Sequence, residues 1–324
     1  MYSNRISTAA RYNLLASDIK KNEEAFNRLT AQLASGKKFS SITEDPIAAV
    51  NIVNTNRQLG QIETFNKNVE MAKTEIQTMD DLLDLANGYL SRAWDKAVQA
   101  NNQTYNDDSL KALKVEIDEI LNTVVDLANT EFNGNYVFAG ANVKLPPYKF
   151  DENGNVIYTG TKQGSPYIRQ YEVADGVYET INTTGDKVFG WYEGDGEGEY
   201  SGLIGTLKLL SNSIQGVVDG HAEGDNAKVQ ESYEKMNSTL SMFQKSLDTI
   251  TAEQTKFGGV YNRLEMTNNT LETNTENLTS YLSQLQEVDI AQAVSDWYQA
   301  QYAYQASLQV ASASMGMSLL NYMQ

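Results

Sequence analysis

Hydrophobic residues recur every seven positions between Pro46 and Ala100, and this repeat constrains the fold more than any other feature of the sequence. One recurring set is Ile62, Val69, Ile76, Leu83, Leu90 and Ala97, and a companion set is Phe65, Ala72, Met79, Ala86 and Ala93. Such spacing forms the seam of a coiled coil. Asp45-Pro46 suits a helix start, because aspartate caps backbone amides and proline fits the first helical position. An unbroken helix over this range would be about 80 Å long at 1.5 Å per residue, which predicts a rod.

Four further segments show hydrophobic residues at alternating steps of three and four, and we expect each to be helical. They run from Tyr12 to Leu33, from Leu110 to Leu127, from Val229 to Ile250 and from Leu271 to Val288. Gly36 is a plausible terminator of the first, because glycine often ends helices. The sequence therefore predicts long helices on both flanks.

The stretch from Ile290 to Gln324 contains a single charged side chain, Asp296, in a chain that is 21% charged. Gln, Ser and Asn interrupt its apolar runs, so it does not read as a membrane span of about 20 apolar residues. Its steps of four and three predict a helical seam made of Ile290, Val294, Trp297, Gln301, Tyr304, Leu308, Ala311 and Met315. The simplest interpretation is a terminal helix that is buried only after subunits assemble.

The middle of the chain has a different character. Three of the four prolines fall there, and Asn153-Gly154 and Asp175-Gly176 separate short runs of β-forming residues. Such pairs are typical of hairpin turns. We therefore expect a small antiparallel β domain inserted between helical flanks.

The predicted fold is mainly α, an elongated rod of coiled-coil-like helices with that insertion. Residues 1–40 and 271–324 are the expected terminal-helix segments, and residues 41–140 and 225–270 are the expected rod helices. Residues 141–224 are the expected β-rich domain. The expected subunit interface consists of Leu15, Ile19, Phe26, Leu29, Ile290, Val294, Trp297, Tyr304, Leu308 and Met315.

Composition argues against several kinds of chemistry. The chain has no cysteine and one histidine, His221, so disulfides, thiolate catalysis and multi-histidine metal sites are excluded. Its net charge of −17 would repel nucleic acid and anionic membranes. No glycine-rich phosphate loop, GxSxG or HExxH motif occurs. We expect a structural protein, with no catalytic residue, metal or cofactor.

Two interpretations from other classes remain as rivals. One is an enzyme whose site lies in the insertion and uses carboxylates such as Asp175 and Glu179. The other is a coiled-coil signalling protein with a sensor insert, which the lack of a membrane span disfavours.

Four stretches resemble one family. They are Asn4 to Thr8 (NRIST), Gln32 to Ala49 (QLASGKKFSSITEDPIAA), Asn133 to Gly140 (NGNYVFAG) and Ala303 to Met323. Their residues and order are similar to those of the bacterial hook-associated protein 3 family, hook–filament junction proteins related to flagellin. The resemblance covers residues 1–141 and 225–324. Flagellin itself, or a minor flagellin, is the alternative, although its usual C-terminal QAGxxxLAQAN-like run is absent.

The resemblance implies a role for each part. The terminal helices would line an inner tube, the long helices would form a rod domain, and the insertion would face solvent. The implied partners are copies of the chain, the adjacent hook-associated protein and flagellin, with an export chaperone before assembly. The N-terminus lacks a cleavable signal peptide, so the resemblance implies export through the flagellar type III apparatus to the extracellular hook–filament junction. Neither nucleic acid nor membrane insertion is expected.

Overall fold

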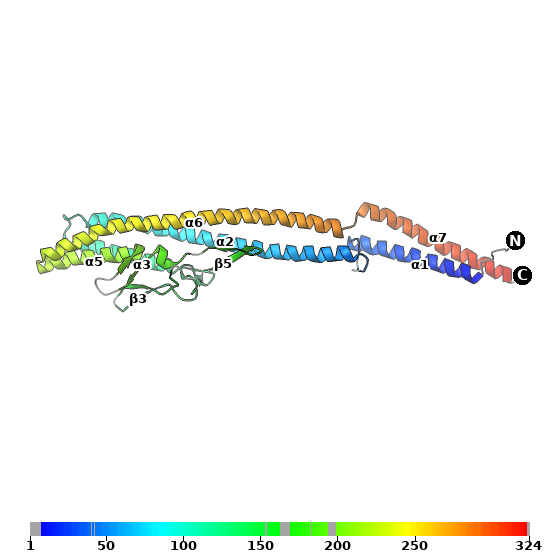
Figure 1. The fold of residues 1–324 in the computed structure, drawn as a ribbon, viewed down its shortest axis with the longest axis horizontal. Coiled ribbons are helices and arrows are strands. Elements are labelled where there is room, and N and C mark those ends of the chain that lie inside the picture. Colours follow the sequence, from blue (N-terminus) through cyan, green and yellow to red (C-terminus); the bar gives the residue numbers. More distant parts are fainter. Residues whose placement is uncertain are drawn as a thin grey trace. The chain divides into compact units, whose positions relative to one another are not determined.

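The computed structural model describes residues 8–39, 41, 43–152, 154–162, 169–181, 183–193 and 199–322, without the side chains of residues 8–9, 192–193, 199 and 315–322. Its long helices are α1 (Thr8–Ser35), α2 (Pro46–Ala100), α3 (Asp107–Ala128), α5 (Gly202–Glu223), α6 (Asn226–Gln286) and α7 (Ile290–Tyr322), and α4 (Gly185–Val188) is a single turn (Figure 1). The mainly helical fold class is confirmed.

The chain divides into two compact units, which are described separately. The terminal unit comprises residues 1–62 and 272–324, and therefore contains α1, α7 and one end each of α2 and α6. The central unit comprises residues 63–271, with the remainder of α2 and α6, helices α3 to α5 and all the strands.

The seven-residue repeat of α2 forms much of the central unit's core. Val69, Ala72, Met79, Leu83 and Ala86 are completely buried. Side chains of α6 pack against the same helix, as in the Trp94–Phe243 ring pair with centroids 6.5 Å apart. On another side, α3 approaches α2 through an ion pair of 2.5 Å between Lys96 and Glu116. The predicted helix from Pro46 to Ala100 is confirmed at both ends.

The strands form short antiparallel hairpins. Within the described residues, β1 (Glu131–Phe132) pairs with β2 (Asn135–Tyr136), β3 (Tyr148–Phe150) with β4 (Val156–Tyr158), β5 (Gln170–Ala174) with β6 (Val177–Thr180), and β7 (Trp191–Glu193) with β8 (Glu199–Ser201). Asp175-Gly176 makes a turn as predicted, with Gly176 at a φ of 69° that favours glycine. Asn153 of the other predicted turn lies outside the described residues.

Polar contacts attach the β5–β6 hairpin to the long helices. Glu75 of α2 is only 2% exposed, pairs with Arg169 and accepts a hydrogen bond of 3.0 Å from the Tyr171 hydroxyl. Arg263 of α6 donates two hydrogen bonds, of 2.9 and 2.8 Å, to the carboxylate of Glu179. Because buried charges are stable only when paired, these contacts fix the hairpin to both helices.

Two features depart from the predicted pattern. Near the end of the expected β-rich segment 141–224, residues Gly202–Glu223 form helix α5 rather than strands. Apolar residues such as Leu203, Leu207, Leu210 and Ile214 are spaced for a helix and are buried. In addition, the helices expected at Val229–Ile250 and Leu271–Val288 merge into one helix, α6, because no proline interrupts the residues between them, and this helix ends at Gln286, before Val288.

Candidate assembly interface

In the terminal unit, α1 and α7 pack against each other in opposite directions. Asn22 of α1 lies beside Ala303 of α7, with 3.5 Å between its amide nitrogen and the Ala303 carbonyl oxygen, whereas Thr30 lies beside Trp297. As the numbers rise along α1 they fall along α7, so the pair is an antiparallel helical hairpin.

An aromatic cluster holds this pair together. The Phe26 ring lies 5.6 Å from the Trp297 ring and 6.1 Å from the Tyr304 ring, measured between centroids. The Trp297 indole N–H donates a 2.8 Å hydrogen bond to the Thr30 hydroxyl, which in turn donates to the Phe26 carbonyl. Ring pairs at such distances add to the stability gained from burial, and the hydrogen bond satisfies the indole. The cluster therefore fixes both the spacing and the register of the two helices.

The backbone around Gly36 fastens the pair to the end of α6. Lys38 donates its amide to the Gln286 carbonyl at 2.8 Å, and Val288 donates to the Gly36 carbonyl at 3.0 Å. Gly36 has a φ of 70°, which an L side chain rarely adopts. At the start of α7, the Asp289 carboxylate accepts hydrogen bonds from the amides of Ala291 and Gln292 at 3.0 and 3.1 Å and so caps this helix. This cap separates α7 from α6.

The structure separates the predicted interface residues into three groups. Half-buried positions in the terminal unit are occupied by Leu15, Ile19, Phe26, Leu29, Trp297 and Tyr304. Ile290, Val294 and Leu308 are 53%, 38% and 44% exposed. Met315 belongs to α7 but lies outside the residues whose side chains are described.

The face of α7 that is covered within the chain agrees with the predicted seam only in part. Trp297, Gln301, Tyr304 and Ala311 of the predicted set are buried or half-buried, and Ala293, Ala300 and Ser307 join them. Small residues between the aromatic ones let the helices approach closely around Phe26, whereas Ile290, Val294 and Leu308 would hold them apart. Sequence reasoning placed Ala311 in the seam but missed Ala293, Ala300 and Thr30, although the alternation of small and aromatic residues was a usable signal.

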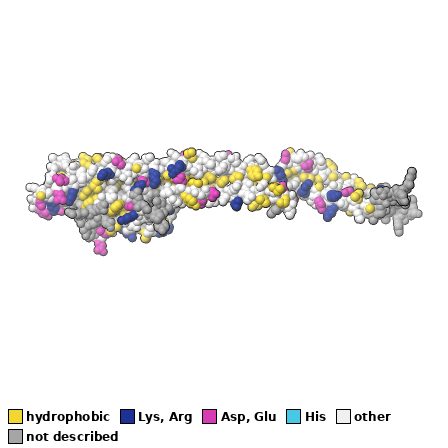
Figure 2. All heavy atoms as spheres, viewed as in Figure 1, with side chains coloured by type: hydrophobic (Ala, Val, Ile, Leu, Met, Phe, Trp, Pro, Cys, Tyr) yellow, Lys and Arg dark blue, Asp and Glu magenta, His cyan; other side chains and the backbone are white. Residues whose placement is uncertain are grey.

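Three predicted residues that lie outside this seam, together with Tyr298, form a second stripe on α7. At about 100° per residue, Ile290, Val294, Tyr298 and Leu308 share one face of the helix. Tyr298 is 50% exposed. Hydrophobic side chains reach the surface along the helices of both units on the face seen in Figure 2. Helix α7 thus has one apolar stripe packed on α1 and another that is uncovered in a single chain.

The carboxylates named in the rival enzyme interpretation have structural places in the β5–β6 hairpin. Glu179 is bound by Arg263, and Asp175 lies in a hairpin turn. Burial raises the pKa of the Tyr148 and Tyr158 hydroxyls, but both donate to backbone carbonyls in the hairpin core. Among described residues, no three His, Cys, Asp or Glu side chains are grouped to hold a metal ion, and no helix is long and apolar enough to cross a membrane.

Two family models match the chain. The bacterial flagellin N-terminal helical region matches residues 6–143, and the bacterial flagellin C-terminal helical region matches residues 240–323. Together they include α1, α3, α7, the whole of α2 and most of α6.

Individual relatives agree with these matches. The flagellar hook-associated protein 3 of Escherichia coli (strain K12) is 26% identical over 326 residues, covering 97% of this chain and 98% of that protein. The flagellin of Bacillus subtilis (strain 168) is 25% identical over 298 residues, covering 89% of each. A solved structure of the flagellar junction protein FlgL from Legionella pneumophila has a TM-score of 0.54 and 17% identity, covering 74% of this chain and all of that one.

Proposed function

Because the chain belongs to the flagellin family of bacterial flagellar proteins, we propose that it is a structural adaptor that joins the hook of the flagellum to its filament. The observation that carries this proposal is the likeness to hook-associated protein 3 from end to end, which includes the inserted region between the two matched helical regions. The proposed role is structural, and no catalytic step belongs to it.

The second stripe of α7 is the proposed surface for assembly. A neighbouring copy would cover Ile290, Val294, Tyr298 and Leu308, while Phe26 and its aromatic partners hold α7 against α1 within each chain. Burial of apolar surface contributes about 25 cal/mol per Å², and no charged side chain on this stripe has to be desolvated. Prior pairing with α1 also lowers the ordering entropy lost on assembly.

The proposed partners follow from this role. Copies of the chain would form a short layer, with the adjacent hook-associated protein on one side and flagellin on the other. Before assembly, the chain would be held by an export chaperone and exported through the flagellar type III apparatus. The absence of cysteine fits a chain that is exported unfolded.

Deletion of the gene tests the role. We expect cells with hooks but no attached filaments, and flagellin released into the medium as monomer; the intact gene, supplied in trans, should restore attachment. Filaments that remain attached to hooks in the deletion strain would refute the junction role.

The likeness to flagellin favours one alternative, a minor subunit of the filament. In that case the deletion would leave filaments attached but change their length or composition. The same micrographs therefore distinguish the two functions.

A further inference from the structure

The start of α2 carries an uncovered apolar patch, the α2 patch, made of Ile47, Val50 and Val53. These side chains are 79%, 59% and 63% exposed, whereas Ala48, on the opposite side of the helix, is buried. At about 100° per residue, the three span about 120° of the helix surface. No charged residue occurs from Pro46 to Asn56, in a chain that is 21% charged. Exposed apolar side chains gathered on an uncharged surface mark an interaction site.

A layer of copies needs two different patches for each contact. Copies placed around a common axis by rotation share one direction and make heterologous contacts, in which a patch on one copy meets a different patch on the next. The second stripe of α7, formed by Ile290, Val294, Tyr298 and Leu308, is therefore not covered by the same stripe of a neighbour. It needs an acceptor elsewhere on the chain, with an apolar surface and no charge to desolvate.

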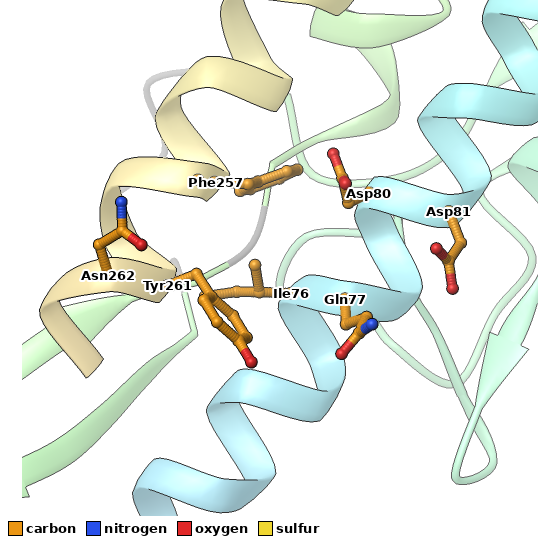
Figure 3. A pocket seen from close by; sticks show the side chains of 8 residues that line it. Ile76, Gln77, Asp80, Asp81, Phe257, Tyr261 and Asn262 are labelled. Atoms are coloured by element: carbon orange, nitrogen blue, oxygen red, sulfur yellow. The ribbon is translucent and has the colours of Figure 1, made fainter. Parts of the chain in front are cut away.

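The groove between α2 and α6 of the central unit is one candidate acceptor. It has a volume of about 380 Å³, and its lining includes Ile76, Gln77, Asp80, Phe257, Tyr261 and Asn262 (Figure 3). Its apolar floor is already covered within the chain, since Ile76 is 2% and Phe257 1% exposed. Carboxylates and amides make up much of the remaining lining, and burying them against an apolar stripe would cost free energy without new hydrogen bonds. The groove is therefore a poor acceptor.

The α2 patch meets both requirements, and its direction also fits. Within the terminal unit, α2 and α7 run in opposite directions (Figure 1). Copies that share one direction keep this relation, so α7 of one copy lies antiparallel to α2 of its neighbour. An antiparallel pair centred on Val50 and Val294 places Ile47 beside Tyr298. Apolar side chains then face one another along the contact.

Two charges beyond the patch favour the same pairing. Arg57 follows Val50 by about two helical turns, within the arc of the α2 patch, and Glu287 precedes Val294 by the same number of residues. The antiparallel pair brings these two side chains together. Both are exposed, and neither makes an ion pair within the part of the chain that the structure describes. Glu287 accepts a 2.6 Å hydrogen bond from the Ser283 hydroxyl, which leaves its charge uncompensated. Charge complementarity thus adds to the apolar match.

We propose that the α2 patch accepts the second stripe of α7 from the neighbouring copy, with Arg57 of one copy paired to Glu287 of the next. This inference rests on the proposed function, because it names the surface that covers the α7 stripe within the layer. Each copy then donates one stripe and accepts another, so the same contact repeats from copy to copy.

Cysteine cross-linking tests the contact directly, because the chain has no cysteine of its own. Val50→Cys and Val294→Cys are carried on separate genes and expressed together in a strain that lacks the chromosomal copy. Isolated flagella are treated with a short bis-maleimide and analysed on a denaturing gel with an antibody to the chain. We expect a cross-linked dimer from the mixture, and monomer alone when either variant is expressed by itself.

Asn56→Cys is the matched control on α2, because Asn56 is exposed and lies about 120° around the helix from Val50. Combined with Val294→Cys, it should give no dimer. Flagella that contain both Val50→Cys and Val294→Cys but yield no dimer would overturn the contact alone. Absence of the wild-type chain from isolated flagella would instead overturn the proposed function, and the contact with it.

Charge exchange gives a second test that needs no cysteine. Arg57→Glu should lower the amount of the chain in isolated flagella about tenfold, because it sets two carboxylates against each other at every contact. Glu287→Arg should do the same, and the two changes in one chain should restore incorporation. A double variant that incorporates no better than the single ones, while circular dichroism shows all three to be folded, would overturn the pairing.

Discussion

Truncation of Phe26 to alanine tests the aromatic cluster that holds α1 against α7. Truncating a fully buried phenylalanine to alanine generally lowers the free energy of unfolding by about 3–5 kcal/mol. Phe26 is only half-buried, so about 2 kcal/mol is expected from burial, and its two ring contacts add about 1 kcal/mol. The free energy that holds the terminal pair together should therefore fall by about 3 kcal/mol, which is on the order of a hundredfold in the equilibrium constant.

Fluorescence of Trp297 can report this loss separately from unfolding of the central unit. The other two tryptophans, Trp94 and Trp191, belong to the central unit, and phenylalanine can replace both. Urea titration of this single-tryptophan protein should then show an earlier transition for Phe26→Ala, while the far-ultraviolet signal of the long helices changes at its original midpoint.

Leu14→Ala is the matched control on the same helix. Leu14 is 67% exposed on α1, so its truncation should cost less than about 0.5 kcal/mol. The reasoning would be refuted if Phe26→Ala left the Trp297 transition in place, or if the two truncations had equal effects.

Three further outcomes are expected. Leu308→Asp places a charge on the proposed assembly stripe, so a deletion strain complemented with this variant should fail to attach filaments. The secreted variant should keep the circular dichroism spectrum of the wild type. Normal filament attachment would contradict the role of the stripe. Burial raises the pKa of Glu253, but a hydrogen bond from Lys187 and a neighbouring lysine charge lower it by more, to below its ordinary value. The stability that Glu253 contributes is therefore present above the ordinary glutamate pKa of about 4.3 and is lost as pH falls through the lower pKa of the folded protein. Lys187→Met should shift this loss of stability to higher pH, which thermal unfolding at a series of pH values would measure. An unchanged pH profile would count against the Lys187–Glu253 pair. Arg263→Ala removes both hydrogen bonds to Glu179 and should cost about 1 kcal/mol in chemical unfolding, because the arginine is largely exposed; no measurable loss would mean that this pair does not anchor the hairpin.

Periodicity predicted the long helices because their core is repetitive. In α2, Val69, Ile76 and Leu83 each meet the same environment one heptad apart, and all are buried. A repeat that long has few alternative structures. The start at Pro46 was equally readable, because the Asp45 carboxylate caps the Ala48 amide at 2.9 Å.

Helix α5 was missed for a local reason. Its sequence contains Gly202, Gly205 and Gly216, and glycine lowers the intrinsic stability of a helix. In the structure these glycines permit close contacts. A Cβ at Gly205 would lie 2.9 Å from the Trp191 carbonyl oxygen, and one at Gly216 would lie 2.4 Å from the Ser232 hydroxyl. Tertiary packing thus overrides the ordinary cost of glycine in a helix.

The α7 seam could be predicted only in part. Trp297 and Tyr304 were identified from spacing, but the choice between two neighbouring stripes depended on what α1 presents to them. Phe26 of α1 contacts the Trp297 and Tyr304 rings, and the half-buried Ala300 lies between these two in the sequence. A single-helix pattern cannot reveal that choice, because the choice belongs to the pair.

Location within the flagellum tests the central claim most directly. A small epitope tag placed in the hairpin turn at Asp175-Gly176, in a strain whose motility it leaves intact, can be mapped with gold-labelled antibody by electron microscopy. The account predicts gold confined to a narrow band where hook and filament meet. Gold distributed along the length of the filament would contradict the junction role and assign the chain to the filament itself.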